Sequence, residues 1–393
     1  MSYRILTLNS ISARGLERLP GDRYQVGAQV VDPHGVLVRS ADMHRMALPE
    51  SLLAVARAGA GTNNVPVATL SARGIPVFNA PGANANAVKE LVLAGLLLGA
   101  RNICQAWDFA RALQGDDKSL DEAVEKGKKN FVGFELPGRT LGVVGLGAIG
   151  VEVANSALTL GMNVLGYDPQ ITVQRAWQMS SSVQQALSLD DLFARSDMIT
   201  LHVPLNDHTR GLVNATRLRL MRHGGMVLNF SRAGIVDEAA VVAALDQKSL
   251  HAYICDFPTN GVKNHPRVVA LPHLGASTNE AEENCAVMAA DQLRDFLENG
   301  NVRNSVNFPE AVLPRASGAT RLAVANSNVP NMVGQISTCL AGAGINIADL
   351  LNKSRGEYAY TLIDADGAID ETLVNRIRQI EGVLSARVVR QDI

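Results

Sequence analysis

The stretch Leu141-Gly-Val-Val-Gly145-Leu-Gly147-Ala-Ile-Gly150 decides the fold of this 393-residue chain. Its first residues, Leu141–Val144, predict a short buried strand, and the residues that follow favour a helix. Glycines in GxGxxG spacing also occur in ordinary turns. Between a strand and a helix, however, this spacing is typical of a loop that binds the pyrophosphate of a dinucleotide.

Each glycine of the motif has its own role in that interpretation. Gly145 permits the tight turn, Gly147 lets the ligand approach the backbone, and Gly150 lets the helix pack closely on the strand. The amides of Ala148 and Ile149, in the first turn of the helix, then face the phosphates. We therefore expect these five residues to bind the cofactor.

A carboxylate beyond the motif distinguishes between two cofactors. Asn163–Tyr167 predicts the next strand, and Asp168 follows it directly. A carboxylate at this position accepts hydrogen bonds from the adenosine ribose and repels a 2′-phosphate, which favours NAD over NADP. The alternative is a plain glycine turn followed by a capping aspartate.

Strand and helix patterns alternate along most of the chain, which predicts an α/β protein with parallel sheets. One series spans residues 3–79, and a second spans 140–270 with the strand number of a doubly wound Rossmann sheet. A helix is expected over Asn279–Asn299, ended by Gly300. Residues 321–393 follow the order βαββαβ of a ferredoxin-like unit.

Composition excludes several classes of function. The formal net charge of -2 predicts no general affinity for nucleic acid or for an anionic membrane. The apolar run Leu91–Ala100 is about half of the ~20 residues that a membrane-spanning helix needs. Residues 1–11 lack the pattern of a signal peptide, so we expect a cytoplasmic protein.

The four cysteines form no CxxC pair, which predicts reduced thiols rather than a metal site or a disulfide framework. They are Cys104, Cys255, Cys285 and Cys339.

Two side chains near the ends of later strands suit the oxidation of a 2-hydroxy acid. This reaction needs a clamp for the carboxylate, a base for the hydroxyl proton and an acceptor for the hydride. Arg232 can bind a carboxylate through two parallel hydrogen bonds from its guanidinium, and His273 provides an imidazole, the side-chain type that most often serves as a general base. Each has an alternative role, as a solvated loop arginine or as a helix-capping histidine. Together with the cofactor motif, the pair favours catalysis.

The segments Gly145–Gly150, Leu201–Leu205, Asn229–Glu238 and Pro272–Ser277 resemble the signatures of the D-isomer-specific 2-hydroxyacid dehydrogenase family, and the similarity runs through about residues 1–305. The resemblance implies a Rossmann domain inserted into a flavodoxin-like substrate domain. The expected bounds are 1–86 and 279–303 for the substrate domain, 87–278 for the NAD domain, 304–320 for a linker and 321–393 for a regulatory domain.

In that family an arginine and a histidine fill the two catalytic roles, and they correspond to Arg232 and His273. The family usually places a glutamate after an Asp-Phe-Pro-like turn, where this chain has Asn260. An amide can orient the imidazole but cannot stabilise its charged form. We expect the cofactor also to contact strand-end residues, namely Val203, Pro204, Phe230, Ser231, Arg232, Asp256, His273, Gly275 and Ala276.

Residues that follow strands of the first series can line the cleft between the domains. Arg39 can hold an anion, Ser40 and Asn84 add neutral donors, and Gly61 lies in a segment that allows close backbone approach. These segments resemble the substrate segments of 3-phosphoglycerate dehydrogenases. The resemblance implies oxidation of 3-phospho-D-glycerate to 3-phosphohydroxypyruvate, the first step of L-serine biosynthesis.

The tail resembles an ACT domain, a module that binds amino acids at subunit interfaces. Asn326, Asn328 and Asn346 are the expected ligand contacts, and the family implies feedback inhibition by L-serine. Alternatively, the tail serves only for oligomerisation. Together with an apolar helix expected over Glu90–Leu113, the tail predicts a homo-oligomer.

Two other functions stay open. One is a related dehydrogenase that uses glycerate, glyoxylate or D-lactate. The other is an NAD-sensing binding protein with weak or no turnover.

Overall fold

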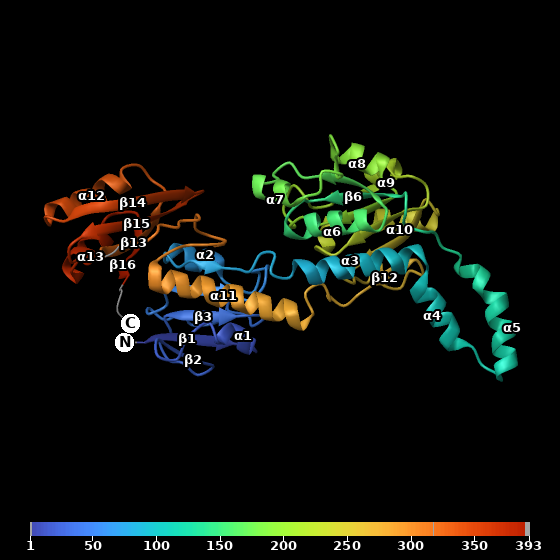
Figure 1. Cartoon of the computed structure of the whole chain (residues 1–393), viewed down its shortest axis with the longest axis horizontal. Coiled ribbons are helices and arrows are strands. Elements are labelled where there is room, and N and C mark those ends of the chain that lie inside the picture. Colours follow the sequence, from blue (N-terminus) through green and yellow to red (C-terminus); the bar gives the residue numbers. More distant parts are fainter. Residues whose placement is uncertain (1, 317, 390–393) are drawn as a thin grey trace. The chain divides into compact units, whose positions relative to one another are not determined.

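The computed structural model describes residues 2–316 and 318–389 and divides into two compact units (Figure 1). Unit 1 comprises the chain up to Asn84 and from Asn279 onward, and unit 2 is Ala85–Thr278. The predicted α/β class is confirmed, with a parallel sheet in each unit and a small antiparallel sheet near the C-terminus.

Unit 2 is built on a seven-stranded sheet of order β12-β11-β10-β9-β6-β7-β8. Every pairing in it is parallel, and the strand order reverses between β6 and β9. Such a reversal creates the crevice where open α/β sheets bind ligands. The strands are β6 (Thr140–Val144), β7 (Asn163–Tyr167), β8 (Gln184–Gln185), β9 (Met198–Leu201), β10 (Gly225–Asn229), β11 (Leu250–Cys255) and β12 (Val268–Ala270).

Helices cover both faces of this sheet, so its central strands are apolar on both sides. On β10, Met226 and Leu228 pack with α3 (Ala85–Ala100) and α6 (Ala148–Thr159), whereas Val227 packs in the opposite cluster. That second cluster contains α8 (Leu189–Arg195), α9 (Ala215–Leu220) and α10 (Glu238–Asp246). A short helix, α7 (Val173–Gln178), follows β7.

The single helix expected over Glu90–Leu113 is wrong. The chain breaks at Asn102, whose φ is 50°, between α3 and α4 (Ile103–Ala112). The last carbonyl of α3, on Ala100, instead accepts the amide of Phe134 at 2.9 Å. Within unit 2, α4 and α5 (Asp117–Gly127) extend away from the sheet, and a 3-10 turn, η1 (Lys128–Phe131), follows them (Figure 1).

The first sheet of unit 1 has the parallel order β2-β1-β3-β4-β5, the arrangement of flavodoxin. Its strands are β1 (Tyr3–Leu8), β2 (Tyr24–Gly27), β3 (Gly35–Val38), β4 (Ala54–Arg57) and β5 (Val77–Phe78), with helices α1 (Ala13–Leu16) and α2 (Val67–Ala72). The helix α11 spans Asn279–Asn299 as predicted, and Gly300 with φ 73° ends it.

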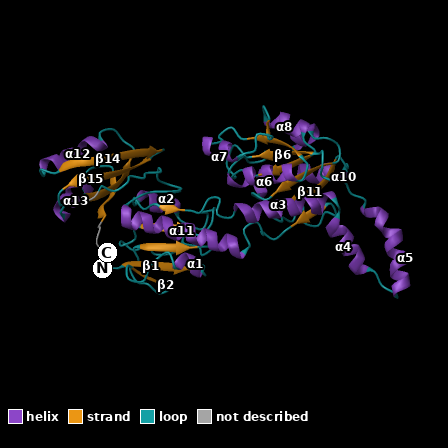
Figure 2. Ribbon diagram, viewed as in Figure 1, coloured by secondary structure: helices purple, strands orange, loops and turns teal. Residues whose placement is uncertain are grey.

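The C-terminal sheet is antiparallel, in the order β14-β15-β13-β16, with α12 and α13 on one face (Figure 2). On β13, Leu322 and Val324 pack with those helices, whereas Ala323 and Ala325 join a core that includes Phe296 of α11. The elements are β13 (Thr320–Ser327), α12 (Met332–Gly342), β14 (Asn346–Arg355), β15 (Tyr358–Asp366), α13 (Glu371–Arg378) and β16 (Val383–Val389).

This sheet therefore shares a core with the N-terminal part of unit 1. In the segment expected to be a linker, Phe308 and Ala311 are fully buried, and Ala311 forms an isolated antiparallel bridge with Val302. Residues 302–313 thus pack within the unit and do not form a free tether.

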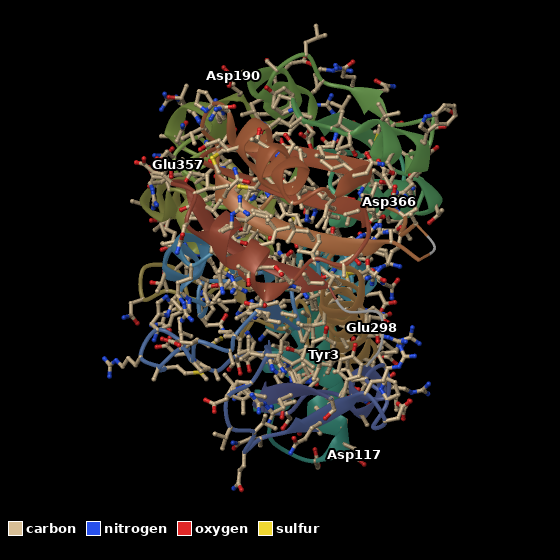
Figure 3. All side chains as sticks on the ribbon, turned by 90° about the vertical axis from the view of Figure 1, so that its left-hand side faces the viewer. Tyr3, Asp117, Asp190, Glu298, Glu357 and Asp366 are labelled. Carbon is tan, nitrogen blue, oxygen red and sulfur yellow. The ribbon has the colours of Figure 1, made fainter. Side chains whose placement is uncertain are left out.

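Donors from neighbouring strands and loops cover the C-terminal end of α11. Helix-end carbonyls have no partner within the helix, and a buried helix end needs other donors. The Tyr3 hydroxyl donates to the Leu297 carbonyl at 2.8 Å. Figure 3 labels Tyr3 and also Glu298, the residue that follows Leu297. The carbonyls of Phe296, Glu298, Asn299 and Gly300 accept from Arg387, Arg315, Arg321 and Tyr360, respectively.

Arg321 is the centre of this arrangement. Its guanidinium binds both carboxylate oxygens of Asp364 at 2.6 and 2.7 Å, and both side chains are 0% exposed. Burial alone would raise the pKa of Asp364, but bonds from Arg321 and from the Ala316 amide hold that pKa below its usual value. The remaining guanidinium donors bind the Leu313 and Pro314 carbonyls.

We predict that Arg321→Met destabilises unit 1 by about 3–5 kcal/mol, because it leaves Asp364 buried and unpaired. The matched control is Arg18→Met, which breaks an exposed pair with Asp291 and should cost less than about 1 kcal/mol. Urea unfolding followed by circular dichroism measures both. Equal losses in the two variants would contradict the assigned role of Arg321.

Candidate active site

The glycine loop lies at the strand-order reversal of unit 2. Gly145 has φ 89°, and a Cβ there would come within 2.5 Å of the His202 carbonyl oxygen, after β9. A Cβ at Gly150 would lie 1.9 Å from the Gly145 carbonyl oxygen, whereas one at Gly147 would meet nothing within 4 Å. The loop thus packs tightly where the helix crosses it and is open at Gly147, as a bound pyrophosphate requires.

The N-terminus of α6 fits the phosphates of a dinucleotide. Gly147 is its cap residue and provides no side-chain acceptor, so the first amides, including those of Ala148 and Ile149, have no side-chain cap. Asp168 accepts the Leu146 amide at 2.8 Å and the Gln170 amide at 2.8 Å. These bonds fix the carboxylate beside the glycine loop, where it suits a ribose.

Other predicted cofactor contacts follow β9 and β10. Val203 and Pro204 come directly after His202, and burial lowers the pKa of His202 to about 3, which keeps it neutral. Phe230 is buried, and the Ser231 hydroxyl donates to the Leu201 carbonyl at 2.6 Å. These contacts join the ends of neighbouring strands on one edge of the sheet.

Asn229 holds the loop that presents Arg232. The amide of this buried residue donates to the Arg232 carbonyl at 2.9 Å, and its oxygen accepts the Ser231 amide at 3.1 Å. The exposed Arg232 guanidinium donates to the Ser231 carbonyl at 2.6 Å. The sequence does not predict this role of Asn229, because a buried asparagine at a strand end looks like an ordinary turn residue.

Asp256 holds the loop that presents His273. His273 has φ 57°, a left-handed conformation that costs energy for a non-glycine residue. Its amide donates to the Asp256 carbonyl at 3.0 Å, and the Asp256 carboxylate accepts the amides of Leu274 and Gly275 at 2.7 and 2.8 Å. Asp256 is 1% exposed, so its position beneath the loop suits anchoring. Ala276 follows in the same loop.

Phe257 brings the two predicted catalytic side chains together. Its ring centroid lies 4.6 Å from that of His273, and the Arg232 guanidinium carbon lies 5.3 Å from the Phe257 ring centre. The arginine and the histidine are therefore both next to one aromatic ring at the carboxyl edge of the sheet. Asn260, three residues farther along, has an exposed side chain.

The predicted substrate residues all follow strands of the parallel sheet in unit 1. Arg39 and Ser40 follow β3, Gly61 follows β4, and Asn84 follows β5. The Asn9 side chain accepts the amides of Ser40 and Ala41. The Asn84 side-chain oxygen is buried and has no hydrogen-bond partner in the described part of the chain.

Glu282 of α11 forms an ion pair with Arg39. Both side chains are more than a third exposed, 38% for Arg39 and 39% for Glu282. The arginine is thus oriented by a carboxylate from a distant segment. No spacing in the sequence connects Glu282 to Arg39.

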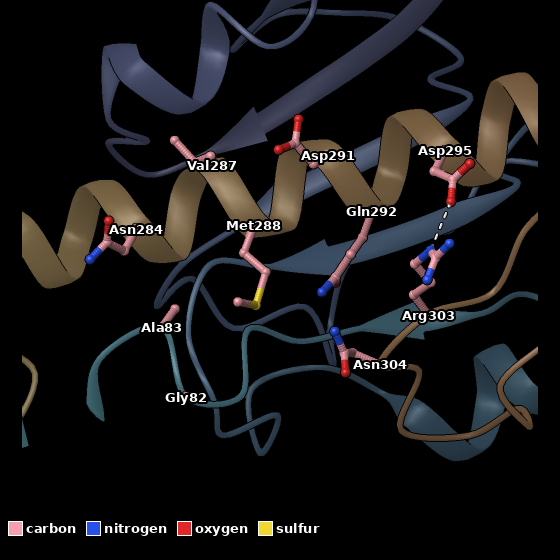
Figure 4. Close-up of a pocket in the computed structure, with 10 residues that line it drawn as sticks. All are labelled: Gly82, Ala83, Asn284, Val287, Met288, Asp291, Gln292, Asp295, Arg303 and Asn304. Atoms are coloured by element: carbon pink, nitrogen blue, oxygen red, sulfur yellow. Dashed lines mark hydrogen bonds and ion pairs between the residues drawn. The ribbon is translucent and has the colours of Figure 1, made fainter. Parts of the chain in front are cut away.

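A pocket of about 660 Å³ lies beside α11 in unit 1 and includes none of the predicted site residues (Figure 4). Its two carboxylates are both paired with arginines, Asp295 with Arg303 and Asp291 with Arg18. Gln292 points from α11 toward the loop that carries Asn304 (Figure 4).

The three asparagines expected to bind an effector do not gather in one chain. Asn326 pairs with Ala359 near the start of β15, whereas Asn346 pairs with Asp366 at the end of that strand. Seven residues of strand separate these ends by roughly 23 Å. Asn328 lies with Asn326, since it donates to the Gly356 carbonyl.

Within residues 2–316 and 318–389, no helix is long and apolar enough to cross a membrane. No group of three potential metal ligands was found in the same described ranges.

Comparison with known proteins assigns the family. Residues 95–275 match the model of the NAD binding domain of the D-isomer specific 2-hydroxyacid dehydrogenases. The chain is 33% identical over 353 residues to the D-3-phosphoglycerate dehydrogenase of Escherichia coli K12, covering 86% of this chain and 82% of that protein. The chain belongs to the D-isomer-specific 2-hydroxyacid dehydrogenase family.

Further relatives support this family assignment. The D-3-phosphoglycerate dehydrogenase of Haemophilus influenzae is 32% identical, covering 86% of this chain and 81% of that protein. An NAD⁺-bound 3-phosphoglycerate dehydrogenase of Entamoeba histolytica has a TM-score of 0.61 at 27% identity, covering 78% of this chain and 99% of that one. The protein is an NAD-dependent dehydrogenase of 2-hydroxy acids, which confirms the predicted cofactor and enzyme class.

We predict that Asp168→Ala weakens NAD binding by about tenfold and narrows the preference over NADP, because the variant loses a ribose acceptor and a charge that repels phosphate. Fluorescence titration with NADH and NADPH measures both affinities. Asp190→Asn, a change in the first turn of α8, is the control and should leave both unchanged. An unaltered cofactor preference in Asp168→Ala would remove this carboxylate from the ribose.

Proposed function

We propose that this dehydrogenase oxidises 3-phospho-D-glycerate to 3-phosphohydroxypyruvate, the first step of L-serine biosynthesis. The observation that carries the proposal is the placement of Arg232 and His273 beside the ring of Phe257. The relatives named D-3-phosphoglycerate dehydrogenase support the substrate.

In this proposal His273 is the general base and Arg232 the carboxylate clamp. The imidazole takes the proton of the C2 hydroxyl, while the guanidinium binds the substrate carboxylate through two parallel hydrogen bonds. When bound, NAD supplies the acceptor for the hydride that leaves C2. The Asp256 anchor matters because a general base must stay within hydrogen-bond reach of the hydroxyl.

Arg39 and Ser40 are proposed to bind the phosphate, with Gly61 and Asn84 as further substrate contacts. The ion pair with Glu282 supports this role of Arg39, because it holds the guanidinium in place before an anion arrives. The side-chain oxygen of Asn84 is buried without a partner, which supports a ligand that donates a hydrogen bond to it.

The C-terminal sheet is proposed to be an ACT domain that binds L-serine and inhibits the enzyme. One chain does not gather Asn326, Asn328 and Asn346. A site made from all three would therefore need the sheets of two copies. β14 supports such pairing, because it is an edge strand with no partner on its outer side in the described chain.

A homo-oligomer is also supported by exposed apolar side chains on the α4–α5 extension. Trp107 on α4 is 58% exposed and Val124 on α5 is 41% exposed, and no residue of α4 is buried. Apolar groups gathered on a projecting element favour contact with a second copy.

Formation of NADH from NAD and 3-phosphoglycerate at alkaline pH tests the substrate. We expect turnover by the wild type and a loss of at least about 10³-fold in kcat for His273→Ala. Arg39→Ala should cost about 10²-fold in kcat/KM with 3-phosphoglycerate but much less with glycerate, which has no phosphate. Equal losses with both acids, or faster oxidation of glycerate or lactate by the wild type, would identify another hydroxy acid as the substrate.

L-serine added to the full-length enzyme tests the regulation. We expect inhibition that Asn346→Ala weakens by about tenfold in serine concentration, because the variant removes one amide from the proposed site. L-threonine is the control ligand, and sedimentation of both proteins checks that the assembly is unchanged. A serine-insensitive wild type would leave the tail a structural role only.

A further inference from the structure

Glu238 has an incomplete set of hydrogen bonds for a carboxylate. It lies in the first turn of α10, where its Oε2 accepts the hydroxyl of Thr259. Its other oxygen, Oε1, is buried and has no hydrogen-bond partner among the described residues. Buried polar atoms in folded proteins nearly always have partners, so an exception of this kind needs an explanation.

The position of Glu238 explains in part why the fold tolerates its buried, unpartnered oxygen. The N-terminus of a helix favours a negative charge, and Glu238 occupies the first turn directly after the cap residue Asp237. A neutral glutamine would accept the same hydroxyl without a buried charge. A purely structural contact with Thr259 therefore gains little from the charge, whereas a charge-assisted bond holds the hydroxyl more firmly.

The partner, Thr259, belongs to the turn that supports the catalytic pair. This turn starts at Asp256, which anchors the His273 loop, and continues through Phe257, whose ring contacts both His273 and Arg232. The carboxylate packs on the turn at a second point, because a Cβ at Gly261 would lie 3.3 Å from Glu238 Oε2. Glu238 is thus the charged group that fixes the far side of the turn.

We propose that Glu238 is a positioning residue for the dehydrogenase reaction. Through the Thr259 hydroxyl it holds the segment Asp256–Gly261, and through Phe257 it fixes the distance between His273 and Arg232. The inference rests on the proposed roles of that arginine and histidine.

The proposal differs from the expectation for Asn260. The side chain of Asn260 is exposed, and no hydrogen bond joins it to His273 in the structure. The turn is held instead by Glu238 of α10, which accepts a hydrogen bond from Thr259, the residue before Asn260. Removing the anchor should loosen the catalytic pair without changing the surfaces that bind the cofactor and the substrate.

Four variants of the full-length enzyme test the idea. Thr259→Val removes the hydroxyl, Thr259→Ser keeps it, Glu238→Gln keeps an acceptor without charge, and the Thr259→Val/Glu238→Gln double variant removes both. Asp190→Asn is the control, because Asp190 is also a first-turn carboxylate of unit 2 and accepts a bond from Arg217 at 3.0 Å. For each protein, kcat, the KM of both substrates and the melting temperature are measured.

We expect Thr259→Val to lower kcat by about tenfold with KM values within about twofold, because misplaced catalytic groups slow the chemistry without weakening binding. Thr259→Ser should recover kcat to within about twofold, and Glu238→Gln should fall between these, with a melting temperature no lower than that of the wild type. The double variant should be no slower than Thr259→Val, since both changes act on one bond. The control should match the wild type.

The proposal is overturned if kcat of Thr259→Val stays within twofold of the wild type, if the losses appear in KM, or if the two single losses multiply in the double variant. These ratios do not depend on the identity of the acid. If the wild type oxidises glycerate, glyoxylate or lactate better than 3-phosphoglycerate, the proposed substrate fails and the same ratios are taken with the better substrate.

Discussion

The structure of unit 1 depends on hydrogen bonds to the C-terminal end of α11. Five consecutive carbonyls at this end point into protein, and each must find a donor outside the helix. Arginines and tyrosines supply these donors, most of them from the C-terminal sheet and the segment that precedes it. The same helix carries Glu282, which orients Arg39. One rigid element therefore joins the C-terminal sheet to the loop proposed to bind phosphate.

The regular elements could be predicted because each depends on local pattern. Asn163–Tyr167 and Asn279–Asn299 have the expected bounds, since a strand buried on both faces and a helix ended by glycine leave clear signals. The break at Asn102 left no such signal. It depends on the amide of Phe134, a residue distant in sequence. This amide donates to the last carbonyl of α3, which would otherwise bond to an amide of the next helical turn.

The candidate site could be predicted only in its outline. Motif spacing predicts the glycine loop and Asp168, and side-chain chemistry near strand ends, with the family resemblance, predicts Arg232 and His273. These predictions rest on parallel strands that bring their carboxyl ends to one edge. The groups that hold those side chains were not predictable. Asn229 and Glu238 look like a turn residue and a first-turn acid in the sequence, and their roles arise from contacts with other segments.

The shared core of unit 1 limits how such an enzyme can be divided or re-engineered. A chain cut before β13 would expose Phe296 and Phe308 to water and leave helix-end carbonyls unpaired, so the shortened product should aggregate rather than fold as an active dehydrogenase. Residues of the C-terminal sheet that face this core are likewise constrained by their packing against the N-terminal part of unit 1. A changed specificity for the proposed effector must therefore arise along the exposed β14 edge and the adjoining loops, where substitutions leave the core intact.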